Sequence, residues 1–101
     1  MTNTLKNLKL QKYKFNIIYI YDKNYQFITN LVDNFFKDKY DLNKRYIKID
    51  ADKSKKILTE LDVTVYPIIL IFNKEDYNMT VSCYVTNFIE NLKNIYNNLL
   101  I

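Results

Sequence analysis

The chain has 101 residues, of which 49% are hydrophobic and 26% are charged, and its formal net charge is +4. This length excludes a large multidomain protein, and an apolar half excludes intrinsic disorder because it can bury a core. No apolar run approaches the roughly 20 residues that a membrane-spanning helix needs. We therefore expect a single domain over residues 1–101 and no membrane span.

The positive charge comes almost entirely from lysine. Arg45 is the single arginine among 15 basic residues, and 11 acidic residues are interspersed with them. Nucleic-acid binders use arginine for bidentate contacts with bases and phosphates, so this composition disfavours a nucleic-acid partner. Because A/T-rich codons also produce an excess of lysine, asparagine, isoleucine and tyrosine, the composition is typical of a protein from an AT-rich genome.

The chain contains one cysteine, Cys83, and no histidine. A single cysteine excludes an intramolecular disulfide, and the commonest general base and metal ligand is missing. We expect no cofactor and an intracellular, reducing compartment, with the cytoplasm favoured over an organelle. Residues 1–14 lack the apolar core of a secretion signal and predict an N-terminal extension or edge element.

The first half of the chain predicts strand, helix and strand. Phe15–Tyr21 is rich in β-branched and aromatic residues, which is typical of a core strand. Apolar residues at three- and four-residue spacing then predict an amphipathic helix over residues 25–39, with one stripe facing a sheet. The members of this stripe are Phe27, Ile28, Leu31, Val32, Phe35 and Phe36. Tyr46–Asp50 alternates and predicts a second strand, parallel to the first.

A short helix and a buried strand should follow. Asp52 is placed to cap a helix whose buried side includes Leu58. Val63–Phe72 is almost continuously apolar and predicts a strand that is buried on both faces. Since proline cannot donate to a ladder, Pro67 should stand at the first residue of this strand or on an edge, where its peptide bond is a candidate for the cis form.

The last part predicts a turn, a returning strand and a helix. We expect Asn73 or Asn78 to take a positive φ in the turn, because the chain has no glycine. Met79–Val85 should return antiparallel as an edge strand. Asn87 and Glu90 have the spacing of a capping box for the final helix. That helix should turn inward Phe88, Ile89, Leu92, Ile95, Tyr96, Leu99 and Leu100.

The order β-α-β-α-β-β-α predicts an α/β fold with a four-stranded mixed sheet and helices on both faces. Residues 46–52, 53–61 and 62–68 give a strand ending in acids, a short helix, a short loop and a proline before an apolar strand. This arrangement resembles the second half of the thioredoxin superfamily. The resemblance spans about residues 15–101 and implies a thioredoxin-like three-layer fold, in which Pro67 is cis and Tyr66 presents its backbone to an extended peptide.

The resemblance fails where the chemistry of the superfamily lies. Its members carry Cys-x-x-Cys at the start of the first long helix, where the helix dipole lowers the thiol pKa. Alignment places Asp22, Lys23, Asn24 and Tyr25 at those four positions, and Asn16 near the position of a buried acid. The chain therefore resembles a redox-inactive member without a catalytic residue.

Several residues also have a simple structural interpretation. Cys83 is better explained as an inert buried thiol than as a reactive one. Asp50 and Asp52 are better explained as a cap and a solvated carboxylate than as a metal site, so we expect no metal. Asp22 fits an N-cap better than an anion site. The lysines within residues 53–56 fit a solvated helix face better than a phosphate patch.

We therefore expect a non-catalytic thioredoxin-like protein that serves as a protein-binding or structural subunit of a larger assembly, with other protein subunits as partners. The expected contact surface is the loop Asp22–Tyr25 beside Tyr66 and Pro67, and the edge strand Met79–Val85 is the alternative surface. Two other functions stay open. One is a diverged single-thiol oxidoreductase that uses Cys83 with glutathione, and the other is a basic nucleic-acid-associated subunit.

Overall fold

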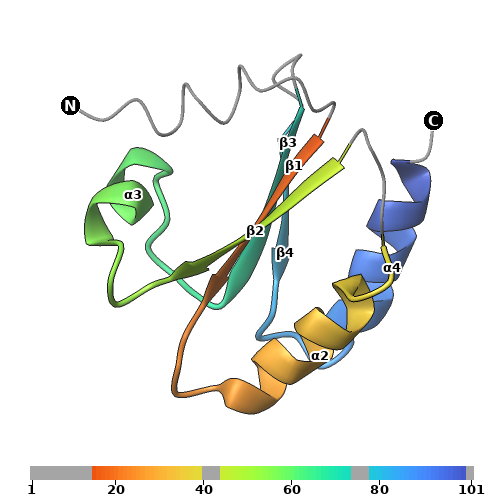
Figure 1. Cartoon of the computed structure of the whole chain (residues 1–101), viewed down its shortest axis with the longest axis horizontal. Coiled ribbons are helices and arrows are strands. Elements are labelled where there is room, and N and C mark those ends of the chain that lie inside the picture. Colours follow the sequence, from red (N-terminus) through yellow and green to blue (C-terminus); the bar gives the residue numbers. More distant parts are fainter. Residues whose placement is uncertain (1–14, 40–43, 74–77, 100–101) are drawn as a thin grey trace.

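The structure is a computed structural model that describes residues 15–39, 44–73 and 78–99 (Figure 1). The elements are β1 (Phe15–Tyr21), α2 (Gln26–Phe36), β2 (Lys44–Asp50), α3 (Lys55–Glu60), β3 (Ile68–Asn73), β4 (Asn78–Ser82) and α4 (Phe88–Asn98). This is the order expected from the sequence. The expected extension at 1–14, the turn at 74–77 and Leu100 lie outside the described residues.

The four strands form one mixed sheet in the order β2-β1-β3-β4. β1 runs parallel to β2 and antiparallel to β3, and β3 runs antiparallel to β4. Helices α2 and α4 cover one face of the sheet, and α3 lies on the other (Figure 1). The predicted α/β fold class is thus confirmed, including helices on both faces.

The central strand β1 is buried on both faces, which explains its continuous apolar sequence. Ile17 and Tyr19 face α2 and α4, whereas Ile18 and Ile20 face α3, and each of these side chains is at most 1% exposed. Burying an apolar side chain of this size contributes about 1.5–3 kcal/mol. The Tyr19 hydroxyl satisfies its hydrogen bond inside the core, with Thr29 Oγ1 at 3.0 Å.

The expected strand over Val63–Phe72 is too long at its start, because β3 begins only at Ile68. The residues before it finish α3. The amide N–H of Val63 donates to the Leu58 carbonyl at 2.8 Å, and that of Asp62 donates to the Thr59 carbonyl at 3.1 Å. These two bonds form a Schellman motif, which leaves the chain turning rather than extended. Pro67 directly precedes β3, is buried and follows a cis peptide bond.

The left-handed residue of this motif is Asp62, with φ 59°. The sequence did not predict a positive φ at this position. The expectation for Asn73 or Asn78 concerned the turn at 74–77, which lies outside the described residues. An ordinary helix end of this type uses glycine, which this chain lacks. Aspartate tolerates the left-handed region better than most residues, and it takes that role here.

The expected helix caps are wrong in detail. α2 starts after Tyr25 instead of being capped by Asp22, and Ser54 rather than Asp52 precedes α3. Asn87 does precede α4, but its side chain makes no capping hydrogen bond, so the capping box with Glu90 does not form. Spacing alone located each helix start to within a few residues without determining which side chain bonds to it.

The apolar stripe of α2 is also divided differently from the expectation. Ile28, Val32 and Phe36 are buried against the sheet and α4. Phe27 and Leu31 instead point outward, with exposed fractions of 65% and 47%. The helix therefore presents apolar side chains to solvent as well as to the core.

Candidate functional site

Three loops meet at one end of the sheet, the lower end in Figure 1. They are residues 22–25 after β1, 61–67 before β3 and 83–87 after β4. The register pairs Ile20 with Ile68 and Ile68 with Ser82, so these strand ends lie side by side. The expected contact loop and the cis proline are thereby brought to the same end of the molecule.

The loop at the start of α2 is a tight turn without sulfur. The Asp22 side chain accepts a hydrogen bond from the Asn24 amide at 2.9 Å, and the Asp22 carbonyl accepts one from the Tyr25 amide at 2.9 Å. Lys23 forms an ion pair with Asp52 at 3.4 Å, and both side chains are largely exposed. Asp22 thus shapes the turn instead of capping the helix, and no thiol stands at the four positions where the superfamily carries its cysteines.

The loop that contains the cis proline is tied to the loop after β4. The Cys83 amide donates to the Pro67 carbonyl at 3.2 Å, and the Tyr84 hydroxyl donates to the Tyr66 carbonyl. The Lys55 ammonium lies 5.8 Å from the centre of the Tyr66 ring. The Tyr66 carbonyl, which the resemblance implied for an extended peptide, is therefore already bonded within the chain.

Cys83 lies just beyond the end of β4, although the sequence predicted it inside the strand. Its side chain is 3% exposed and belongs to the core between the sheet, α2 and α4. Burial raises the pKa of the thiol from its ordinary value of 9.0 to about 12. At neutral pH this group is therefore a protonated thiol, which is a poor nucleophile.

Exposed apolar side chains gather at this end of the molecule. Within the described ranges, the large hydrophobic residues that are exposed are Tyr25, Phe27, Leu31, Val65, Tyr84 and Val85. We call these six residues the apolar end surface. All of them lie in the three loops or in the first half of α2. Exposed apolar side chains that form a patch are a feature of interaction surfaces, and the Tyr25 and Phe27 rings are in edge-to-face contact here, with centroids 6.4 Å apart.

From the sequence, Tyr25 was expected in the contact loop, and Tyr84 and Val85 were expected in the alternative surface Met79–Val85. Phe27, Leu31 and Val65 were not expected at a contact surface. A signal for two of them was present. At 3.6 residues per turn, the predicted stripe from Phe27 to Phe36 spans roughly 180° of the helix surface, which is wider than one contact with a sheet needs. The part of the stripe that does not contact the sheet is the side with Phe27 and Leu31, and these two side chains are exposed.

Other candidate residues lie apart from this end or are explained locally. Asn16 is buried near the start of β1, opposite Phe72, roughly 13 Å along the strand from Ile20. Asp50 accepts a hydrogen bond from the Asp52 amide at 2.9 Å, so it shapes the turn before α3. In the part of the chain that the structure describes, no group of three or more His, Cys, Asp or Glu side chains could hold a metal.

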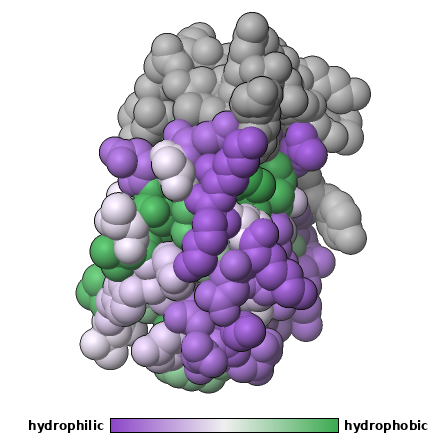
Figure 2. Space-filling view, turned by 90° about the vertical axis from the view of Figure 1, so that its left-hand side faces the viewer, coloured by the Kyte–Doolittle hydropathy of each residue, from purple (hydrophilic) through white to green (hydrophobic). Residues whose placement is uncertain are grey.

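The lysines on the α3 side form a solvated face. Lys53, Lys55 and Lys56 are all exposed. Figure 2 shows that this side of the molecule is mostly hydrophilic. Among the described helices, none is long and apolar enough to cross a membrane.

Comparisons with known proteins agree with this geometry at the level of the fold. The oxidised thioredoxin from Plasmodium falciparum is 12% identical, with a TM-score of 0.69, and the match covers 95% of this chain and 92% of that one. A thioredoxin from Schistosoma mansoni is 15% identical, with a TM-score of 0.67 and coverage of 89% and 83%. A mutant thioredoxin from Halobacterium salinarum is 14% identical, with a TM-score of 0.60 and coverage of 81% and 72%.

These similarities define the class of fold, which is thioredoxin-like, and they confirm the fold that the resemblance in the sequence implied. No protein-family model matches the chain, and no curated protein matches it at the sequence level. At this level of identity the shared fold does not carry a shared activity with it.

Proposed function

We propose that this protein is a non-catalytic thioredoxin-like domain that binds another protein chain and works as a subunit of a larger assembly. Its contact surface is the apolar end surface, which contains the end of the loop Asp22–Tyr25 and lies beside Tyr66 and Pro67. The observation that carries this proposal is the concentration of exposed apolar side chains at the one end of the fold where no cysteine pair stands.

The chemistry of this end favours an apolar segment as its partner. Lys23 and Asp52 form an ion pair here, and Tyr84 is bonded to Tyr66. The exposed side chains offered to a ligand include Phe27 and Val65, which are both more than half exposed. Burying such area is the main favourable term in most protein association.

A catalytic role through the single thiol is less well supported. Thiol exchange needs an accessible thiolate, and Cys83 is buried with a pKa raised to about 12. A protein with one cysteine and no disulfide partner also fits an intracellular, reducing compartment, which we include in the proposal.

Site-specific photo-crosslinking in cells of the native source tests this proposal. A photoreactive phenylalanine analogue is placed at Val65, in the apolar end surface, and separately at Lys56, an exposed control position on α3. We expect a discrete crosslinked protein from position 65 and none from position 56. Mass spectrometry of the product would identify the partner chain.

A third crosslinking position separates the two surfaces that the sequence left open. β4 is an edge strand, and Thr80 on it is exposed, so it reports on partners that pair with the sheet edge. Crosslinks from position 80 without any from position 65 would move the contact surface to β4. Absence of a discrete product from both positions would contradict the proposal.

A further inference from the structure

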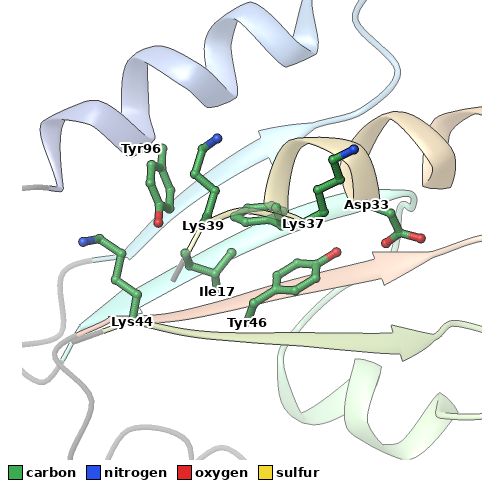
Figure 3. Close-up of a pocket in the computed structure, with 8 residues that line it drawn as sticks. Ile17, Asp33, Lys37, Lys39, Lys44, Tyr46 and Tyr96 are labelled. Carbon is green, nitrogen blue, oxygen red and sulfur yellow. The ribbon is translucent and has the colours of Figure 1, made fainter. Parts of the chain in front are cut away.

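A second candidate site lies at the opposite end of the sheet from the apolar end surface. It is a pocket of about 470 Å³ between the C-terminal end of α2, the first halves of β1 and β2, and α4 (Figure 3). Small-molecule sites in proteins typically have volumes of about 300–1,000 Å³. The pocket thus has the size of a small-ligand site.

The walls of the pocket are aromatic and apolar. The Tyr46 ring stacks on the Phe36 ring, with centroids 4.2 Å apart and planes 20° from parallel. Tyr96 meets Phe36 edge to face at 5.9 Å, and Ile17, which is 1% exposed, also lines the pocket. Such walls favour a flat apolar body, because ring contacts are attractive in both stacked and edge-to-face geometry.

The rim of the pocket is positively charged. Among the described residues that line it are three lysines, Lys37, Lys39 and Lys44, and one carboxylate, Asp33. In Figure 3 Lys44 and Tyr96 lie at one end of the pocket, and Lys37 and Asp33 lie at the other. Asp33 is already paired with Lys48 outside the lining set, at 3.0 Å. The rim therefore favours an anion.

The location of two of these lysines at the end of α2 accounts for their positive charge at the rim. Lys37 and Lys39 follow the C-terminus of the helix, where the macrodipole favours cations, and Lys39 is 3.3 Å from the exposed carboxylate of Asp38. Lys44 comes from a different element. It stands on β2, and its ammonium lies 5.4 Å from the centre of the Tyr96 ring. Strand and helix thus bring cations to the same pocket from two directions.

The Tyr46 hydroxyl gives a further reason to look for a ligand. It is buried, and within the described part of the chain it has no hydrogen-bond partner. Burial, reinforced by the nearby Asp33, raises the pKa of Tyr46, so the hydroxyl keeps its proton and can donate. A buried polar group without a partner is rare in proteins and calls for an explanation.

We propose that this pocket binds a small aromatic carboxylate. The flat ring lies against Tyr46, Phe36 and Tyr96, the carboxylate is held by the rim lysines, and the Tyr46 hydroxyl donates to it. This site is separate from the apolar end surface and does not depend on the proposed function.

Titration of the full chain by NMR, with naphthoate as the probe, tests the proposal. Neutral naphthamide is the control for the ring, and acetate is the control for the charge. We expect naphthoate to bind at least about tenfold more tightly than naphthamide, with acetate showing no saturable shift. Equal affinity for naphthoate and naphthamide, or no saturable shift with naphthoate, would overturn the proposal.

Matched variants locate the binding. The double change Lys37→Gln and Lys44→Gln should weaken naphthoate binding about tenfold without affecting naphthamide. The control change Lys53→Gln and Lys56→Gln removes the same charge from the α3 side and should alter naphthoate binding less than about twofold. Equal losses in the two double variants would mean a general charge effect and would contradict the site.

Tyr46→Phe tests the hydroxyl separately. It keeps the aromatic wall, and circular dichroism would verify that the variant folds. Weaker naphthoate binding with unchanged naphthamide binding is expected, and unchanged binding of both ligands would contradict donation by Tyr46.

Discussion

Two tyrosines with buried hydroxyl groups, Tyr19 and Tyr46, show how much depends on a single hydrogen bond. Tyr19 bonds to Thr29 Oγ1 at 3.0 Å, whereas Tyr46 has no hydrogen-bond partner in the described part of the chain. Tyr19→Phe should therefore destabilise the protein by about 1–2 kcal/mol, because it leaves the buried Thr29 hydroxyl unpaired. Tyr46→Phe should instead be neutral or stabilise it by about 1 kcal/mol. Urea denaturation of the two variants measures the contrast, and equal losses would contradict it.

Cys83 should react only when the protein opens. Because its pKa is raised from 9.0 to about 12, the folded state keeps the thiol proton at pH values where the unfolded state has lost it. Ionisation of this thiol therefore leaves the free energy of unfolding unchanged below about pH 9 and lowers it as the pH rises from about 9 toward about 12. The free energy of unfolding should thus fall more steeply above about pH 9 in the natural chain than in Cys83→Ala.

Alkylation by iodoacetamide gives a second measurement of the same thiol. We expect the folded chain to be modified at neutral pH only at the rate of its opening, with fast modification in denaturant. Rapid modification of the folded chain would contradict an inert thiol and favour the single-thiol oxidoreductase.

At the scale of the element, α2 has one apolar face that packs in the core and one that is exposed to solvent. Ile28→Ala should cost about 2–5 kcal/mol, since Ile28 is 7% exposed and belongs to the core. Phe27→Asp should change stability by less than about 0.5 kcal/mol, because Phe27 is exposed and the first turn of α2 has no acidic residue to complement its dipole. Thermal or urea denaturation of both variants checks this. A large loss in Phe27→Asp would place that side chain in the core instead.

The end of α3 is a second test at this scale. Asp62→Gly should stabilise the protein by about 0.5–1 kcal/mol, because glycine adopts the left-handed region without a steric penalty. The matched control Lys56→Gly, inside α3, should cost about 1 kcal/mol. Equal losses in the two variants would show that the motif does not require a left-handed residue.

These elements also show what the sequence alone could predict. Apolar periodicity identified every described helix and strand and their order, since burial on one face or on both leaves a clear pattern over seven or more residues in β1 and α2. Boundaries were less accurate. Val63–Pro67 carries strand-forming residues, but its backbone completes the Schellman motif and precedes a proline that cannot pair.

The candidate site was predictable only in part. The loop Asp22–Tyr25 and Pro67 follow from the resemblance, because topology brings those strand ends together. Which apolar side chains remain exposed depends on the orientation of α2 about its own axis, relative to the sheet, and on what covers the loops. The spacing of apolar residues along the chain does not determine that orientation, so Phe27 and Leu31 were predicted to face the core.

At the scale of the whole molecule, a thioredoxin-like fold carries two distinct surfaces at opposite ends of one sheet. The apolar end surface holds exposed hydrophobic side chains, and the pocket between α2, β2 and α4 holds lysines around an aromatic wall. Neither surface uses a thiol. The chain thus shares its fold with thioredoxins but has one cysteine, whereas dithiol chemistry needs two.

An assay of disulfide reduction by the purified full chain tests most directly whether this thioredoxin-like fold lacks dithiol activity. With dithiothreitol as the reductant and insulin as the disulfide substrate, we predict the same rate of insulin reduction with and without the protein, because Asp22–Tyr25 contains no sulfur and Cys83 is buried. A rate that rises in proportion to the concentration of the chain, and that disappears in Cys83→Ala, would contradict this prediction.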